Sequence, residues 1–127
     1  MDSRWYVART KPLAEYAARD GLLDAGLEVF LPCVQTPRPR NGHQDVPLFP
    51  GYLFVRCNLE TLSWRRLRWI PHFVGLVRFG DVATWVPDGV ITELVERVES
   101  INNDGGVRTR LRPGDVISVV LGRGENF

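Results

Sequence analysis

The stretch GYLFVRC at residues 51–57 constrains the fold most, because it is apolar on both faces of an extended strand. Successive side chains of a strand point to opposite faces, so Leu53 and Val55 share one face while Tyr52 and Phe54 share the other. Helices of the same domain can cover one face, but a chain of 127 residues has little left to cover the second. Two interpretations of Tyr52 and Phe54 are therefore open: buried core, or an apolar docking surface.

Length and composition indicate one ordinary domain and a remnant of another. The hydrophobic share of 44% and the charged share of 24% are typical of soluble globular proteins. No apolar run approaches the roughly 20 residues that a membrane-spanning helix needs. The N-terminus MDSRWYV lacks the layout of a secretion signal, which favours a cytoplasmic location. A net charge of +1 predicts nothing about nucleic acid unless the charges are clustered.

The residues that carry chemistry form no catalytic or metal-binding pattern. Cys33 and Cys57 are far apart and have no His or Cys at ligand spacing, so they are expected to be reduced, half-buried thiols. His43 and His72 have no partner in sequence that would complete a triad or a metal site. No glycine-rich phosphate loop is present. We therefore predict that the protein is not an enzyme and uses no cofactor or metal.

The first half of the chain is predicted to alternate strands with one helix. Small apolar residues recur at helical spacing from Pro12, which suits a first helical turn, to Gly26, which suits a helix end. The second strand is interrupted by prolines, which implies an edge or a projecting ribbon. The expected elements are a strand at 4–10, a helix at 12–26, a strand at 27–37, a hairpin tip at Asn41-Gly42 and a strand at 46–57.

The second half is predicted to contain two helices and a further strand. A short amphipathic helix at 60–70 is followed by a strand at 73–80, an extended segment at 84–87 and a strongly amphipathic helix at 90–101. The order β-α-β-β-α-β predicts an α+β fold, an RRM-like split β-α-β sandwich with a four-stranded antiparallel sheet and helices mainly on one face.

One function that this layout suggests is binding of single-stranded RNA, as in RRM domains. Trp5 and Tyr6 on the first strand, with Tyr52 and Phe54 on the third, occupy the strands that carry the stacking aromatics of an RRM. The match is incomplete, because three positions of the third strand depart from the RRM motif: Pro50, Leu53 and Cys57. The RRM-type RNA-binding domain is kept as the alternative function.

Four motifs in compatible order resemble the N-terminal domain of the NusG family of bacterial transcription factors. They are RWYVARTKP, PLFPGYLFVRC, SWRRLRWIPHFVGLVRFG and VPDGVITEL, and together they extend from Arg4 to Glu99. VRFG followed by VP and Val90-Ile91 is more similar to the specialised RfaH-like members. The resemblance implies a transcription elongation or antitermination factor that suppresses pausing or termination, with the N-terminal (NGN) domain at 1–104 and a linker with the truncated start of a KOW domain at 105–127.

The resemblance also implies where RNA polymerase binds. In this family the open sheet face docks on the clamp helices of the largest polymerase subunit, and a neighbouring segment meets the gate loop of the second subunit, so that the domain bridges the DNA channel. Carried over by position, the clamp-binding residues are Tyr52, Phe54, Phe79 and Ile91. The gate-loop segment corresponds to Ser63, Trp64 and Arg65.

Basic residues could also place the domain beside upstream or non-template DNA. The candidates for phosphate contact are Lys11, Arg38, Arg40, Arg65, Arg66 and Arg68. For any single arginine, a solvated helix face is the favoured interpretation over DNA contact, by roughly two to one. Residues 107–127 contain one strand-like segment that cannot pair with itself, and we expect it to pair with an edge of the N-terminal sheet or with a neighbouring chain. We also expect the protein to be a fragment of a longer factor.

Overall fold

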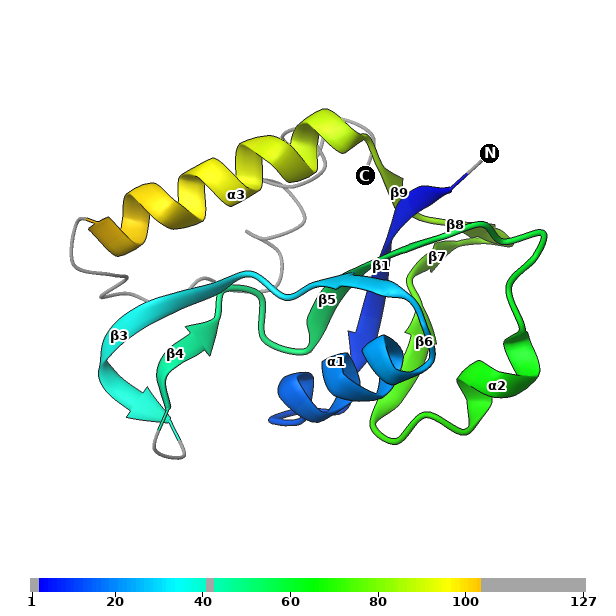
Figure 1. Ribbon diagram of the computed structural model, residues 1–127, viewed down its shortest axis with the longest axis horizontal. Helices are drawn as coiled ribbons and strands as arrows, with labels where there is room; N and C mark the ends of the chain where they lie inside the picture. The colour runs from blue at the N-terminus through cyan, green and yellow to red at the C-terminus, as the bar shows by residue number, and fades with distance from the viewer. Residues whose placement is uncertain (1–2, 41–42, 104–127) are drawn as a thin grey trace. The chain divides into compact units, whose positions relative to one another are not determined.

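An antiparallel sheet organises the computed structural model, which describes residues 3–40 and 43–103 (Figure 1). β1 (Arg4–Thr10) pairs with β5 (Tyr52–Cys57) on one edge, and with β6 (Phe73–Leu76) and β9 (Trp85–Val86) on the other. β2 (Glu28–Phe30) pairs with the far edge of β5. The predicted α+β class with antiparallel pairing is confirmed. The sheet has five strands instead of the four predicted, because β9 also pairs with β1, beside the strand order β2-β5-β1-β6.

The register of β1 and β5 fixes which side chains share a face. Phe54 lies opposite Val7, and Tyr52 lies opposite Arg9. Directly opposed residues of an antiparallel pair project to the same side of the sheet. The predicted separation of Tyr52 and Phe54 from Leu53 and Val55 is therefore confirmed. The face that carries Tyr52, Phe54, Arg9 and Val7 is called the Tyr52–Phe54 face below.

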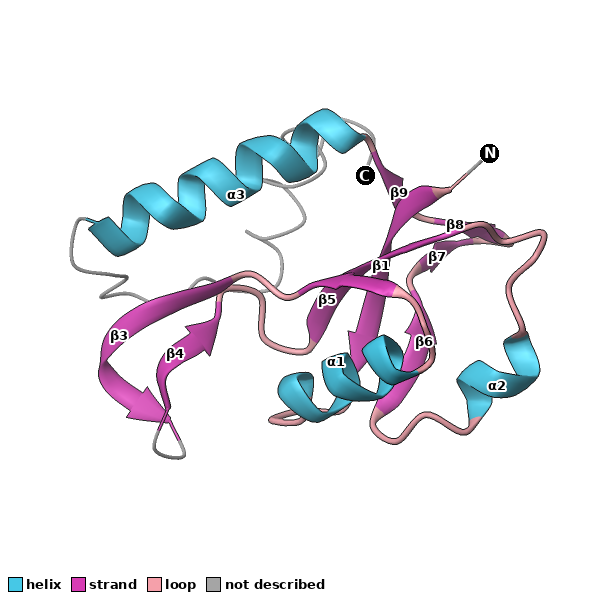
Figure 2. Ribbon diagram, viewed as in Figure 1, coloured by secondary structure: helices cyan, strands magenta, loops and turns pink. Residues whose placement is uncertain are grey.

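α1 (Glu15–Asp24) begins later than the sequence suggested and is tied to the sheet at its start (Figure 2). The prediction of a start at Pro12 was wrong, because Leu13 has a φ of 62°, a left-handed conformation that no helical residue adopts. The carboxylate of Glu15 is fully buried and accepts a hydrogen bond of 2.8 Å from the N–H of Gly51. This bond fastens the helix to the turn that precedes β5.

α1 ends at the glycine that the sequence indicated. The N–H of Leu27 donates to the carbonyl of Leu22 at 3.2 Å, and the N–H of Gly26 donates to that of Leu23 at 2.9 Å, which together form a Schellman motif. Gly26 has a φ of 89°, which glycine adopts without strain. Ala18 and Leu22 are fully buried, so the predicted small apolar stripe does pack inward.

The described residues fall into two compact units, the first formed by 3–31 and 50–88 and the second by 32–49 and 89–103. In the second unit β3 (Cys33–Arg40) and β4 (His43–Pro47) form an antiparallel hairpin. The strands predicted at 27–37 and 46–57 are each divided in two, at Pro32 and at residues 48–51. Proline lacks the N–H that a ladder needs, and Gly51 has a φ of 85°. The expected hairpin tip at Asn41-Gly42 lies outside the described residues.

α3 (Asp88–Asn103) confirms the helix predicted at 90–101. Ile91 and Leu94 are its buried side chains, as the apolar spacing indicated. Near its end, Asn102 Oδ1 accepts a hydrogen bond of 2.9 Å from the N–H of Gln35 in β3. Glu93 and Arg97 form an exposed ion pair of 3.2 Å one turn apart.

Three short elements complete the first unit: α2 (Trp64–Arg68), β7 (Arg78–Phe79) and β8 (Val82–Ala83). The predicted short helix is confirmed, whereas the strand predicted at 73–80 is divided into β6 and β7. No helix within the described residues is both long and apolar enough to cross a membrane. The segment in which the start of a KOW domain was predicted lies outside the described residues.

Candidate protein-docking and nucleic-acid surfaces

The Tyr52–Phe54 face holds two of the four predicted clamp-binding residues. Phe54 is only 2% exposed, and its ring stacks on that of Phe30 with centroids 6.0 Å apart and planes 24° apart. Tyr52 is half-buried beside the exposed Arg9. Phe54 therefore supports this face from within the sheet layer, and Tyr52 contributes accessible area.

Phe79 occupies the β7–β8 hairpin, which is hydrogen-bonded to β1. The N–H of Val77 donates to the carbonyl of Val7 at 2.8 Å, and Val7 lies opposite Phe54. Phe79 is 52% exposed, and Val82, paired with it across the turn, is 67% exposed. The hairpin thus exposes two apolar side chains, Phe79 and Val82, and is bonded to β1 at Val7, the residue opposite Phe54.

The sequence analysis did not find this hairpin or the contribution of Val82. The signal was Gly80-Asp81 between two short apolar segments, a two-residue loop of the kind that connects hairpin strands. Gly80 has a φ of 61°, the conformation of the first central residue of a type II′ turn. Ile91, the fourth predicted residue, is 7% exposed and belongs to the second unit.

The predicted gate-loop segment forms the start of α2. Ser63 caps the helix, because its Oγ accepts a hydrogen bond of 3.3 Å from the N–H of Arg66. Trp64 is 40% exposed, and the guanidinium of Arg78 lies 5.5 Å from the centroid of its ring. Arg65 is exposed. All three predicted side chains therefore lie within one helical turn.

The basic candidates for DNA contact lie on α2, on β3 and in the loop after β1. Arg65, Arg66 and Arg68 are exposed on α2, and within the described part of the chain none of them makes a salt bridge. Lys11 is exposed after β1. Arg38 and Arg40 lie in β3. Arg65, Arg66 and Arg68 therefore lie together on α2.

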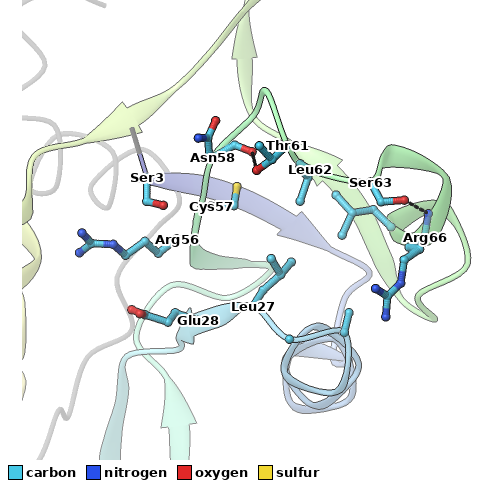
Figure 3. A pocket seen from close by; sticks show the side chains of 13 residues that line it. Ser3, Leu27, Glu28, Arg56, Cys57, Asn58, Thr61, Leu62, Ser63 and Arg66 are labelled. Atoms are coloured by element: carbon cyan, nitrogen blue, oxygen red, sulfur yellow. Dashed lines mark hydrogen bonds between the residues drawn. The ribbon is translucent and has the colours of Figure 1, made fainter. Parts of the chain in front are cut away.

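A pocket of ≈410 Å³ lies where the ends of α1 and β5 adjoin α2 (Figure 3). Cys57, Asn58 and Ser63 are among its lining residues. Burial raises the pKa of the Cys57 thiol to about 11, so the sulfur is protonated and unreactive near neutral pH. No group of three His, Cys, Asp or Glu side chains suited to a metal ion occurs among residues 3–40 and 43–103.

The comparison with protein families decides between the two functions that the sequence left open. The family model described as "Transcription termination factor nusG" matches residues 3–95. The chain belongs to the NusG family. NusG proteins are transcription factors and not enzymes, which confirms the prediction that this chain is not an enzyme. The RRM alternative gains no support, and two of its four proposed stacking aromatics, Tyr6 and Phe54, are buried at 6% and 2% exposure.

Named relatives match nearly the whole chain at low identity. The "Transcription termination/antitermination protein NusG" of Buchnera aphidicola and that of Escherichia coli K12 are each 23% identical to it over 137 residues, covering 98% of this chain and 76% of theirs. The Pseudomonas aeruginosa protein of the same name is 22% identical over 140 residues, covering 79% of that protein.

A solved structure confirms the NusG-like fold. The structure described as "Domain interaction in Thermotoga maritima NusG" superposes with a TM-score of 0.53 and 22% identity. The match covers 76% of this chain and 57% of that one. At this identity the likeness concerns the fold.

Proposed function

We propose that this protein is a transcription elongation and antitermination factor that docks on the clamp helices of RNA polymerase through Tyr52, Phe54, Phe79 and Ile91. Family membership supports the proposal. The exposed apolar pair of Phe79 and Val82 also supports it, because their hairpin is hydrogen-bonded to β1 at Val7, the residue opposite Phe54. In the described conformation Tyr52, Phe79 and Val82 offer the accessible area, Phe54 is buried within the sheet face, and Ile91 is a buried residue of α3.

The proposed mechanism is bridging rather than catalysis. With one surface on the clamp and the segment Ser63–Arg65 at the gate loop of the second large subunit, the domain spans the DNA channel and disfavours clamp opening. A bound factor shifts such an equilibrium only by its difference in affinity for the two states, and a few kcal/mol suffices for a large change in population. Pausing and termination, which need an open clamp, then become rarer.

Further parts of the proposal rest on the resemblance of the motifs. We assign the protein to the RfaH-like subtype, residues 1–104 to the N-terminal domain built as a split β-α-β sandwich, and residues 105–127 to a linker and the start of a KOW domain. Lys11, Arg38, Arg40 and the three arginines of α2 are assigned to upstream or non-template DNA.

The exposure of Phe79 is the single observation that carries the docking proposal. A phenylalanine that is 52% exposed beside a valine that is 67% exposed leaves apolar area in water. Covering such area contributes ~25 cal/mol per Å² before the costs of association are subtracted. A partner with an apolar helical surface gains this term without unfolding any part of the domain.

Co-elution with purified RNA polymerase tests the proposal. Phe79→Asp places a charge in the docking surface and should reduce polymerase binding at least tenfold. Leu23→Asp changes a similarly exposed apolar residue, 48% exposed on α1, and should leave binding intact. Equal binding by the two variants, both shown to be folded by circular dichroism, would reject docking through the β7–β8 hairpin.

A further inference from the structure

The pocket where the ends of α1 and β5 adjoin α2, called the α1–α2 pocket below, has opposite charges on its two sides. Its volume of ≈410 Å³ lies within the range of small-molecule sites. Figure 3 shows Glu28 on one side of the pocket and Arg66 on the other, with Leu27 and Leu62 between them. All of its lining residues belong to the first unit, so the pocket is formed within one compact part of the chain.

The Glu28 side of the pocket is electronegative. Glu28 is exposed and makes no salt bridge within residues 3–40 and 43–103. Ala25 and Gly26, at the C-terminal end of α1, also line the pocket, and the last turn of α1 carries no basic residue to offset the negative end of the helix dipole. The charge of Arg56 on this side is already offset, because its Nη1 lies 3.7 Å from Oδ2 of Asp88. This side therefore suits a cationic group.

The Arg66 side is electropositive. Arg66 is exposed on α2, and it makes no salt bridge in the part of the chain that the structure describes. Ser63 lines the pocket beside it, and its Oγ accepts the N–H of Arg66 at 3.3 Å, so the hydroxyl can donate its own proton to a ligand. Arginine forms its strongest hydrogen bonds to anions such as carboxylates. This side therefore suits an anionic group.

Apolar side chains lie between the two charged sides. Leu67 and Cys57 are 4% and 6% exposed, and Leu27 and Leu62 are half-buried. Burial raises the pKa of the Cys57 thiol to about 11, so it stays neutral and adds no charge near neutral pH. An apolar body that covers these side chains leaves water at a gain in free energy.

We propose that the α1–α2 pocket binds a small amphipathic zwitterion, of the kind that a short apolar peptide with free termini provides. Its ammonium group contacts Glu28 and the C-terminal end of α1, and its carboxylate contacts Arg66 and Ser63. Its apolar side chains cover Leu62 and Leu67. Each charged end of the ligand then meets the opposite charge, and its apolar part is withdrawn from water.

This site is separate from the proposed docking on polymerase. Tyr52, Phe54 and Phe79 do not line the pocket, whereas Ser63 and Arg66 do. The test therefore uses the free protein, so that a failure of docking through Phe79 would not change its outcome.

A simple organic anion is the competing ligand. It would use Arg66 and the apolar lining but leave Glu28 without a partner and place no positive charge at the end of α1. A requirement for the ammonium group therefore distinguishes a zwitterion from an anion.

The test titrates the isotope-labelled full chain with the dipeptide Leu-Phe and follows amide shifts by NMR. We expect saturating shifts at Leu27, Asn58 and Leu62, with a dissociation constant of roughly 1 mM or tighter for a ligand of this size. Acetyl-Leu-Phe lacks the ammonium group, and Leu-Phe-amide lacks the carboxylate. Each should bind about two- to fivefold more weakly, the effect of losing one exposed ion pair.

Two variants remove the charges of the pocket one at a time. Glu28→Gln should weaken binding of Leu-Phe by about two- to fivefold and leave binding of acetyl-Leu-Phe unchanged, because that peptide has no ammonium group. Arg66→Gln should weaken Leu-Phe to the same extent and leave Leu-Phe-amide unchanged. Arg65→Gln and Glu96→Gln alter exposed charges outside the pocket and should bind Leu-Phe as the parent does. The amide spectrum of each variant shows whether it is folded.

Weaker binding of both capped peptides, with each variant insensitive to the matching cap, supports the proposal. It is overturned if Leu-Phe at about 10 mM gives no saturating shift, or if the shifts centre on Trp69 and Phe79, which are exposed apolar residues outside the pocket. It is also overturned if acetyl-Leu-Phe binds as tightly as Leu-Phe, because the ligand would then be a simple anion. Equal binding by Leu-Phe-amide would overturn it in the same way, as the ligand would be a simple cation.

Discussion

Replacing Phe54 and Phe79 separately by alanine removes the same atoms from two environments. Phe54 is 2% exposed and stacks on Phe30 at 6.0 Å, so its removal loses the full transfer term, the aromatic pair and the packing around it. Such a substitution costs about 3–5 kcal/mol. Phe79 is 52% exposed, so the fold hides only about half of its area. Burying a whole phenylalanine side chain is worth roughly 1.5–3 kcal/mol, and half of this is about 1 kcal/mol.

The assay is urea unfolding followed by circular dichroism and tryptophan fluorescence, with the free energy of unfolding extrapolated to water. Phe54→Ala should lower it by at least about 2 kcal/mol more than Phe79→Ala does. A domain has only ~5–15 kcal/mol in total, so the Phe54 variant should be conspicuously less stable. If the two variants lose the same free energy of unfolding within about 0.5 kcal/mol, the conclusion that Phe54 is a buried structural residue and Phe79 an exposed one is refuted.

Two other substitutions test the packing. Gly21→Ala should lower the unfolding temperature by several degrees, because the added Cβ would lie 2.8 Å from Cγ2 of Ile70. The cost of relieving this overlap should exceed the roughly 1 kcal/mol that alanine gains over glycine in helix propensity. A rise in the unfolding temperature would contradict this contact. In a Cys33→Ser background, iodoacetamide should alkylate Cys57 far more slowly at pH 8 than a free thiol and faster as the pH approaches its pKa of about 11. Rapid labelling of the folded protein at pH 8 would show that this thiol is not buried.

Elements with a strong period or a clear end signal could be predicted from the sequence. α3 followed from its apolar spacing, and the end of α1 followed from Gly26, because only glycine fits the left-handed residue after a helix. The start of α1 could not be predicted in the same way. Pro12 suits a first turn, but tertiary contacts decide, and the bond between Glu15 and the N–H of Gly51 places the start at Glu15.

The candidate surfaces were predicted unevenly for a similar reason. Alternation along β5 correctly placed Tyr52 and Phe54 on one face, but alternation does not state how deeply each side chain is buried. The enclosure of Phe54 depends on Phe30, which reaches it through pairing of β2 with β5. Likewise, the 82% exposure of Trp69 follows from its position at the end of a single helical turn, which the periodicity of so short a helix does not reveal.

Pausing by purified RNA polymerase tests the central claim most directly. Single-round transcription over a strong pause site should show a shorter pause lifetime when the protein is added, because the proposed bridging of the channel would keep the clamp closed. The Phe79→Asp variant should leave the lifetime near that of polymerase alone, while Leu23→Asp should act as the parent does. A pause lifetime that the parent protein does not shorten, or that Phe79→Asp shortens equally, would contradict the account.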